Sequence, residues 1–366
     1  MKIIASLLAV ALSSVASAAS SSSKVSAITH VHKHPVHHQR SLKDLDQLKA
    51  ELEAWKKSES HEAAKQLGVY AGQDGDFESD DPNEDLARLY LAKQSVAEAQ
   101  ERNPEAIFSL KSPFTLLLPE EFTEYVARGF DIMSAGSAAT PTATPNTASP
   151  ASNSSDSVDW STSECLAPPQ QQGRCCCCWA FAAVASLESA NCIKTGKFTK
   201  LSEQELTTCA IDDGCDGSYP HLSLTFIKQR GGLSSAASYP FTNGAFEVAE
   251  QLDFDVVKVS DEILSWPGQP KDPSRLRDAL KKQPVAIGVT AGNADFKQYD
   301  GGVLRRCGSV GLDHAVLAVG YSVTSRGSTV FKVRNWWGES WGEQGYFRVQ
   351  SSACRIIDYG YYPELV

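Results

Sequence analysis

The sequence lacks an excess of basic residues and, beyond its first twenty positions, any long hydrophobic run. Its 366 residues include 34 Lys and Arg against 44 Asp and Glu, which gives a net charge of −10. A basic face of the size that nucleic acids require is therefore not expected. No segment after the N-terminus is apolar enough to predict a stable membrane insertion. Hydrophobic residues at 42% and charged residues at 21% exclude wholesale disorder, collagen and a coiled coil.

The N-terminus has the pattern of a secretory signal peptide, which we predict over residues 1–18. Lys2 precedes an apolar stretch over residues 3–12 that is too short to span a bilayer, and Ala16-Ser17-Ala18 matches the small-residue cleavage motif. The alternative is the start of a buried helix. Cleavage after Ala18 predicts an oxidising destination, either secretion or a lysosome-like acidic compartment, where the ten cysteines can form disulfides.

Composition distinguishes three further zones. Residues 19–131 begin with a histidine-rich tract, which we interpret as solvated rather than as a metal site, and continue with a helical pattern that includes a helix over about 84–102. Residues 132–155 form an uncharged linker rich in Ser, Thr, Pro and Ala, with the single N-glycosylation sequon at Asn153. Residues 156–366 run from an alanine-rich helical stretch to strand-like segments, which predicts an α+β domain with two subdomains.

The candidate nucleophile opens the helical stretch of this last zone. Cys178 directly precedes that stretch, and the positive end of a helix dipole favours a thiolate. A thiolate nucleophile needs a base and a group that orients the base. Only His221 and His314 follow residue 155, and Asn335 lies 21 positions after His314. Cys, His and Asn in this order and far apart are typical of a cysteine protease.

Four spaced motifs resemble the papain-like cysteine proteases, the family that includes the cathepsins. They lie at residues 172–181, 215–220, 313–316 and 335–346, so the resemblance covers the whole last zone. It implies a two-lobed α+β fold in which a helical lobe and a β-barrel-like lobe enclose the active-site cleft. It also implies hydrolysis of peptide bonds through an acyl-enzyme. No insertion resembling an occluding loop lies between Cys178 and Cys215, which favours endopeptidase action.

The resemblance assigns catalytic roles to four residues. Cys178 is the nucleophile, His314 is its base and then the general acid, and Asn335 holds the imidazole. Gln172 forms the oxyanion hole together with the backbone N–H of Cys178. Trp337 shields the hydrogen bond between the histidine and the asparagine. The resemblance implies no metal and no cofactor.

The resemblance further implies a substrate-binding set around one main pocket. This pocket receives the side chain one residue before the cleaved residue. Because its walls carry no charge at the base, we expect a preference for bulky apolar or aromatic side chains, with Arg disfavoured. The set comprises Gly217, Ser218, Tyr219, Pro220, Gly288, Leu312, Asp313, Ala315, Trp337 and Tyr359.

Residues 19–131 resemble the inhibitory prosegment of the family in part. Of six characteristic helix positions, Glu84, Arg88 and Asn103 keep the family residue, whereas positions 92, 95 and 99 do not. The alternative is an independent helical domain. The prosegment interpretation implies a monomeric zymogen that acid converts to the mature enzyme, with its own prosegment and polypeptide substrates as partners.

The resemblance implies two disulfides, Cys175–Cys215 and Cys307–Cys354. A third would start at Cys209, but its usual downstream partner is absent; Cys192 or Cys165 could substitute, and the pairing stays open. The nucleophile and the four bridged residues leave five further cysteines, which is an odd number. At least one more thiol is therefore expected outside internal disulfides.

Three positions depart from the family pattern. Cys176 replaces a glycine of the cleft, Ser218 replaces another glycine, and Trp336 replaces a serine. The cysteine run predicts that a neighbouring thiol can condense with an oxidised Cys178, and it leaves open whether Cys176 or Cys177 does so. The alternative is that these thiols are merely small buried residues.

Two other functions compete with the protease interpretation. The first is a zinc site built from Cys175, Cys178, Cys209 and Cys215, which would leave Gln172, His314 and Asn335 without roles. The second is a catalytically impaired binding protein with a papain fold.

Overall fold

The computed structural model describes residues 35–70, 82–127, 156–211, 214–243, 262–265, 272–308 and 311–364. The predicted signal peptide, the linker over 132–155 and the sequon at Asn153 lie outside these ranges, as do His30, His32 and His34. Within the described ranges, none of the helices combines the length and the apolar character needed to cross a membrane.

The N-terminal zone is helical, as expected, and consists of α2 (Pro35–Trp55), α3 (Glu59–Gln66), α4 (Pro82–Arg102), β1 (Ala106–Phe108) and α5 (Pro119–Ala127). Helix α4 agrees closely with the helix expected over 84–102. Arg88 on this helix binds Glu84 one turn earlier, with Nη2 to Oε1 at 2.9 Å. It also forms two hydrogen bonds with Glu121 of α5, at 2.5 and 2.9 Å. A charged side chain thus ties α4 to α5.

The helical lobe contains α6 (Cys178–Thr195), α7 (Glu203–Cys209) and α8 (Pro220–Arg230). Alanine has the highest helix propensity, and the alanine-rich α6 is buried along most of its length, so it forms the centre of the lobe. Gly196 ends α6 at φ 72°, a left-handed conformation that glycine adopts without steric cost.

The structure contradicts the predicted involvement of Cys209 in the third disulfide. Cys192 of α6 pairs with Cys165, with α-carbons 5.2 Å apart, and Cys209 keeps its thiol at the end of α7. The other two disulfides are Cys175–Cys215 and Cys307–Cys354. Because Cys175 and Cys215 are oxidised to each other, the zinc alternative loses two of its four ligands.

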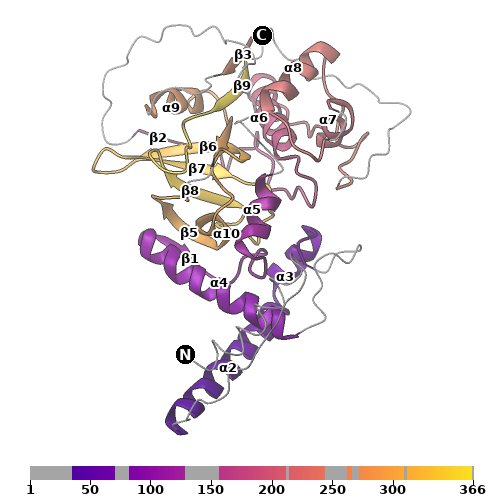
Figure 1. Ribbon diagram of the computed structural model, residues 1–366. Helices are drawn as coiled ribbons and strands as arrows, with labels where there is room; N and C mark the ends of the chain where they lie inside the picture. Colours follow the sequence, from indigo (N-terminus) through magenta and orange to yellow (C-terminus); the bar gives the residue numbers. More distant parts are fainter. Residues whose placement is uncertain are drawn as a thin grey trace.

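The second lobe is a mainly antiparallel sheet (Figure 1). Its strands follow the order β1-β5-β8-β7-β6-β4-β9-β3, and β2 pairs with β6. The β-barrel-like expectation is corrected here, because this path leaves the sheet open and the described strands close no barrel. The strands are β2 (Ser157–Asp159), β3 (Glu262–Ser265), β4 (Val285–Val289), β5 (Tyr299–Leu304), β6 (His314–Val323), β7 (Thr329–Arg334), β8 (Tyr346–Gln350) and β9 (Gly360–Glu364), and the accompanying helices are α9 (Ser274–Leu280) and α10 (Ala294–Lys297).

The N-terminal zone and the sheet lobe share one hydrophobic core. Phe114 and Phe122 belong to the same buried cluster as Trp337 and Phe296. Strand β1 also extends the sheet, since it pairs antiparallel with β5 at the sheet edge. An independent helical domain would keep its core to itself, so this packing argues against that alternative.

Candidate active site

Cys178 is the first residue of α6 and is completely buried. Its Sγ accepts a hydrogen bond from the backbone N–H of Ala315, at 3.4 Å. Ala315 follows His314 at the start of β6, so this contact brings the two lobes together at the thiol. The packing of α6 against β6 therefore brings Cys178 close to the start of the strand that begins with His314.

The His314 imidazole is held on two sides. Nε2 lies 2.8 Å from Oδ1 of Asn335, and the ring stacks on Trp337 with centroids 4.9 Å apart. The backbone N–H of Trp336 donates to the same Oδ1 at 2.9 Å, which fixes the orientation of the amide. An amide oxygen can only accept, so Nε2 carries the proton and Nδ1 remains to act as a base.

Gln172 lies beside the cysteine run, held to the opposite lobe through its main chain. Its backbone N–H donates to the carbonyl of Trp336 at 2.9 Å. Its side-chain Nε2 donates to the carbonyl of Cys175 at 3.1 Å. Because an amide nitrogen has two hydrogens, the second one remains for another acceptor.

Burial keeps both reacting groups neutral in this state. It raises the pKa of the Cys178 thiol to about 12, although the hydrogen bond from Ala315 lowers it. Burial lowers the pKa of His314 to about 4, against the raising effect of Asn335. Between these values the thiol keeps its proton and the imidazole stays uncharged, so a thiolate–imidazolium pair does not form.

The C-terminal part of the N-terminal zone covers these groups. Tyr125 of α5 is partly buried, and the neighbouring thiols of Cys176, Cys177 and Cys178 contribute, after burial, to raising its pKa. Its hydroxyl donates to the carbonyl of Gly173 at 2.9 Å. Figure 1 shows α5 lying against the protease lobes, between the sheet and the helical lobe.

Aromatic packing extends this cover over the histidine side. Phe114 packs edge-on against Trp337 at 4.9 Å, and Phe122 does so at 5.7 Å. Lys297 of α10 donates to the carbonyl of Leu117 from a buried position. The tryptophan that stacks on His314 is thus itself enclosed by the N-terminal zone.

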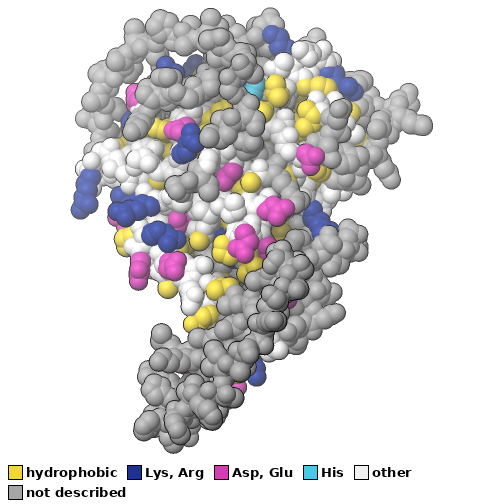
Figure 2. All heavy atoms as spheres, viewed as in Figure 1, with side chains coloured by type: hydrophobic (Ala, Val, Ile, Leu, Met, Phe, Trp, Pro, Cys, Tyr) yellow, Lys and Arg dark blue, Asp and Glu magenta, His cyan; other side chains and the backbone are white. Residues whose placement is uncertain are grey.

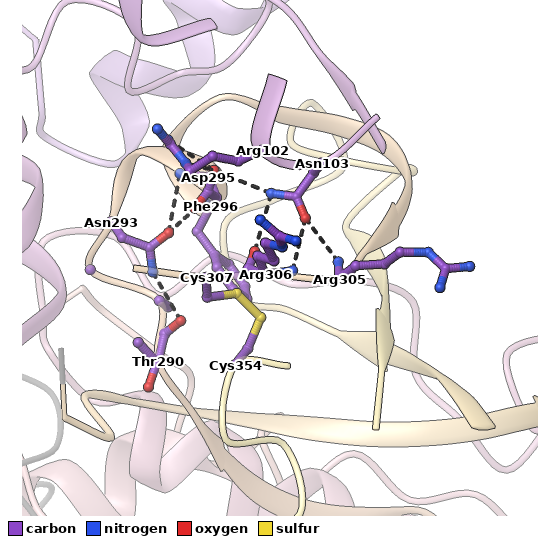
Figure 3. The surroundings of a disulfide bond; sticks show 12 residues. Arg102, Asn103, Thr290, Asn293, Asp295, Phe296, Arg305, Arg306, Cys307 and Cys354 are labelled. Atoms are coloured by element: carbon purple, nitrogen blue, oxygen red, sulfur yellow. Dashed lines mark hydrogen bonds and ion pairs between the residues drawn. A yellow bond between two sulfur atoms is a disulfide. The ribbon is translucent and has the colours of Figure 1, made fainter. Parts of the chain in front are cut away.

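A second attachment lies at the end of α4 (Figure 3). Oδ1 of Asn103 accepts the backbone N–H groups of Arg305 and Arg306, at 2.9 and 2.8 Å. Nδ2 of Asn103 donates to the carbonyl of Arg306 at 3.2 Å, and Arg102 binds the buried Asp295 at 3.0 Å. The loop that receives Asn103 continues directly into the disulfide-bonded Cys307.

The comparisons with known proteins decide the family. The family described as "Papain family cysteine protease" matches residues 154–364, which is more than half of the chain. The chain belongs to the papain family. This confirms the resemblance drawn from the four motifs, and the solved structures below confirm the papain-like fold with its proform arrangement.

Two relatives and two solved structures illustrate the similarity. Vignain from Phaseolus vulgaris is 40% identical over 54% of this chain and 55% of the relative. The senescence-specific cysteine protease SAG12 from Arabidopsis thaliana is 39% identical over 53% and 56%. The chain thus spans about half the length of the curated relatives it matches.

The similarity of structure extends into the N-terminal zone. The proform of the ragweed pollen cysteine protease Amb a 11 is 27% identical, with a TM-score of 0.73 over 92% of this chain and 97% of that chain. A digestive procathepsin L 3 of Tenebrio molitor is 28% identical, with a TM-score of 0.61 over 84% and 100%. We refer to residues 35–70 and 82–127 of this papain-family chain as the prosegment from here on.

The residues expected around the main pocket come from both lobes. Gly288 of β4 pairs with Ala315 of β6, and its N–H donates to the carbonyl of Tyr359 at 3.2 Å. Leu312, Ala315 and Tyr359 share a buried cluster with Cys178, and Tyr219 packs against its edge. The structure therefore brings these pocket residues together.

The other expected substrate residues occupy different positions. Pro220 begins α8 directly after Tyr219, and Gly217 and Ser218 form the preceding loop, where Gly217 has φ 90°. The Asp313 carboxylate turns toward the sheet lobe and accepts the N–H groups of Ala291 and Gly292, at 2.7 and 2.9 Å. Burial raises its pKa to about 6. Asp313 thus stabilises a loop of its own lobe in this state.

The sequence analysis gave no role to His221, which contacts Tyr359, one of the residues expected around the main pocket. Its Nδ1 lies 3.1 Å from the hydroxyl of Tyr359, and its ring stacks on Tyr361 at 5.0 Å. Burial lowers the pKa of His221. The only available signal was that it is one of two histidines after residue 155, because its contact with Tyr359 joins positions 138 residues apart.

Two features that could indicate a different kind of site are metal-ligand clusters and patches of one charge. The described residues contain no group of His, Cys, Asp and Glu side chains arranged to hold a metal ion. On the face shown in Figure 2, basic and acidic side chains of the described residues are interspersed.

Proposed function

We propose that the chain is a cysteine endopeptidase made as a zymogen. The observation that carries this proposal is the contact of Cys178 Sγ, at the N-terminus of α6, with the backbone N–H of Ala315. Ala315 directly follows His314, which Asn335 holds by Nε2. A nucleophile, a base and a group that orients the base are the three parts that covalent catalysis at a thiol requires.

The reaction begins when the prosegment leaves the cleft. Solvent access then lowers the pKa of Cys178 and raises that of His314, because burial is the main cause of both shifts. His314 Nδ1 takes the thiol proton, and the Cys178 sulfur attacks the peptide carbonyl. The same imidazole then protonates the leaving amine, and a water molecule hydrolyses the acyl-enzyme with His314 again as the base.

Two donors are placed to stabilise the oxyanion. The backbone N–H of Cys178 is at the first turn of α6, where N–H groups have no partner within the helix. The Gln172 amide, on the adjacent loop, supplies the second donor. Donors prearranged for the developing negative charge lower the barrier to attack.

The test of the nucleophile uses neighbouring cysteines of the same run. Cys178→Ala or Cys178→Ser should abolish peptide hydrolysis, whereas Cys177→Ser should retain much of it. A cysteine-directed epoxide should label the activated enzyme at Cys178. Normal turnover by the Cys178→Ala protein would exclude the proposed mechanism. A folded protein that neither hydrolyses peptides nor reacts selectively at Cys178 would support the binding-protein alternative.

We further propose that the main pocket prefers bulky apolar or aromatic side chains. Its walls include Leu312, Ala315 and Tyr359, which belong to a buried apolar cluster. Burial of apolar surface is favourable by roughly 0.8 kcal/mol per methylene, whereas an unpaired guanidinium is penalised. In a peptide library, we expect Leu or Phe to exceed Arg at least tenfold in kcat/KM at this position, and a preference for Arg would refute the proposal.

A matched pair of variants tests the closed end of the pocket. Tyr359→Ala removes the ring and should admit longer side chains, with at least a tenfold change in relative kcat/KM. Tyr359→Phe removes only the hydroxyl that meets His221 and should keep the wild-type preference. Equal profiles for all three proteins would show that Tyr359 does not limit the pocket.

The proposed function includes the compartment of the protein and the removal of its N-terminal segments. We assign the protein to secretion or to a lysosome-like acidic compartment, with a signal peptide over 1–18, a glycan at Asn153 and removal of residues 19 to about 155 on acidification. The support is the signal-like N-terminus and the uncharged linker, since processing proteases need an exposed, extended segment. Sequencing the N-terminus before and after acidification, with and without a glycosidase, tests all three assignments.

A further inference from the structure

The run Cys176–Cys178 places its three thiols in different surroundings. The Cys177 thiol donates to the carbonyl of Cys175 at 3.5 Å and belongs to the apolar core of the helical lobe. The Cys176 thiol is also buried but lies outside both hydrophobic clusters. It lies 3.6 Å from the carbonyl oxygen of Tyr125, which belongs to the prosegment. The Cys176 thiol therefore contacts the prosegment, whereas the Cys177 thiol bonds within its own lobe.

The Cys178 thiol also has a contact outside the helical lobe. Its Sγ lies against Ala315 of the opposite lobe, and Tyr125 lies beside these thiols. The prosegment thus covers both Cys176 and Cys178, and its departure opens both to the cleft. The Cys177 thiol also lies near Tyr125, but the hydrogen bond that it donates goes to the carbonyl of Cys175 in its own lobe.

The backbone between the two cleft thiols is compact. Cys177 has φ −97° and ψ 28°, so its two neighbours lie closer together than they would across an extended residue. Disulfides bridge α-carbons about 4.4–6.8 Å apart, a range that a turn conformation allows for residues i and i+2.

We propose that Cys176 is a redox modification site that forms a disulfide with Cys178 when the mature enzyme meets hydrogen peroxide. The proposal rests on the proposed function, since it needs a reactive thiolate at Cys178. In the first step the Cys178 thiolate attacks peroxide, one O–O bond breaks, and sulfenic acid and hydroxide form. In the second step the Cys176 thiol displaces water from this sulfenic acid, and the S–S bond forms.

The consequence is protection of the nucleophile. Peroxide is reduced to water, and the two cysteines are oxidised together by two electrons. A disulfide can be returned to thiols by a dithiol reagent, whereas sulfinic and sulfonic acids cannot. Oxidation therefore stops at a state from which the enzyme recovers, and the glycine that the family usually has at position 176 supplies no such thiol.

The experiment compares activated wild type, Cys176→Gly and Cys177→Ser after a pulse of peroxide followed by dithiothreitol. Each recovery is divided by the activity of the same variant treated with reductant alone, which removes effects on the Cys175–Cys215 disulfide and on basal turnover. Wild type and Cys177→Ser should recover most activity, and Cys176→Gly at least tenfold less. Equal recovery in wild type and Cys176→Gly, or loss of recovery in Cys177→Ser, would overturn the proposal.

Mass spectrometry separates this proposal from the catalytic one. Before reduction, wild type and Cys177→Ser should carry the bond between Cys176 and Cys178, and Cys176→Gly should carry sulfinic or sulfonic acid at Cys178. If Cys178 proved not to be the nucleophile, mass spectrometry would still show whether the disulfide between Cys176 and Cys178 forms. A bond between Cys177 and Cys178, or sulfonic acid at Cys178 in wild type at the same peroxide dose, would refute the assignment.

The uncleaved proform provides a second arm. Because Tyr125 covers both thiols, peroxide should modify them at least tenfold more slowly in the proform than in the mature enzyme. Equal rates in the two forms would contradict the shielding part of the proposal.

Discussion

At the scale of single residues, the side-chain amide of Gln172 uses one of its two N–H groups in a hydrogen bond within the protein. Its side chain is buried, one N–H donates to Cys175, and its Oε1 has no hydrogen-bond partner among the described residues. This arrangement presents a preset donor next to the nucleophile. Such donors act chiefly on the transition state, because negative charge develops there.

We therefore expect Gln172→Ala in the activated enzyme to lower kcat by about 10²–10³-fold with little change in KM. Gln171→Ala is the matched control, since Gln171 approaches Trp337 through a backbone bridge that the variant keeps. Steady-state kinetics of the two variants check this prediction. A rise in KM at constant kcat would instead place Gln172 in ground-state binding.

At the scale of elements, the prosegment is attached to the rest of the chain at β1, at α5 and at Asn103. Strand β1 extends the sheet edge at β5, and α5 covers the cleft. Asn103, directly after α4, satisfies two backbone N–H groups of the loop before Cys307 (Figure 3). A buried N–H that loses its partner costs about 1–3 kcal/mol.

Asn103→Ala should consequently weaken latency. We expect the variant proform to activate at least tenfold faster at a fixed pH, because closure loses the bonds to Arg305 and Arg306. Glu101→Ala, an exposed change on the same helix, should activate at the wild-type rate. Time courses of activity and cleavage at a fixed pH measure both. If the two variants behaved alike, this attachment would have no share in latency.

At the scale of the whole molecule, protonation links prosegment closure to pH. Burial lowers the pKa of His314 to about 4 in the closed proform, from the usual 6.5. The open form therefore binds more protons below pH 6.5. To the extent that opening exposes the imidazole to water, the closed state loses stability as pH falls from about 6.5 to about 4.

Two other groups act in different windows. Burial lowers the pKa of Lys297 in the closed form to about 7, from 10.5. The closed form therefore loses stability as pH falls from 10.5 to about 7, and Lys297 has no further effect on closure below pH 7. Burial raises the pKa of Asp313 to about 6. Protonation of this carboxyl stabilises the closed form in acid only if opening exposes the carboxyl to water. Its partners Ala291 and Gly292 belong to the protease domain, which limits that exposure.

We expect the Cys178→Ala proform, which cannot cleave itself, to show increasing hydrogen exchange in α5 as pH falls from 6.5 to 4. The rates are compared with those of unstructured amides at each pH. When the profile is extended above pH 7, adding Lys297→Met should flatten that part and leave the acid limb intact, since His314 governs the acid limb. An acid limb that disappeared with Lys297 would contradict the role of His314.

The family and much of the local structure followed from the sequence alone. The motifs around Cys178, His314 and Asn335 identified the papain family, which the match over 154–364 confirms. The strand-like segments expected after the helical stretch of the last zone are found, among them β4, β6, β7 and β8. These features were accessible because helix and strand patterns depend on neighbours a few positions away along the chain.

Tertiary structure alone decided the contacts between distant elements. It paired Cys192 with Cys165 rather than Cys209, left the sheet open, and joined His221 to Tyr359. It also turned Cys176 toward Tyr125 and Cys177 toward the lobe interior, which the run of identical residues left open. The physical reason is that a side chain's partner depends on which elements pack against it, and the spacing of residues along one element carries no information about that packing.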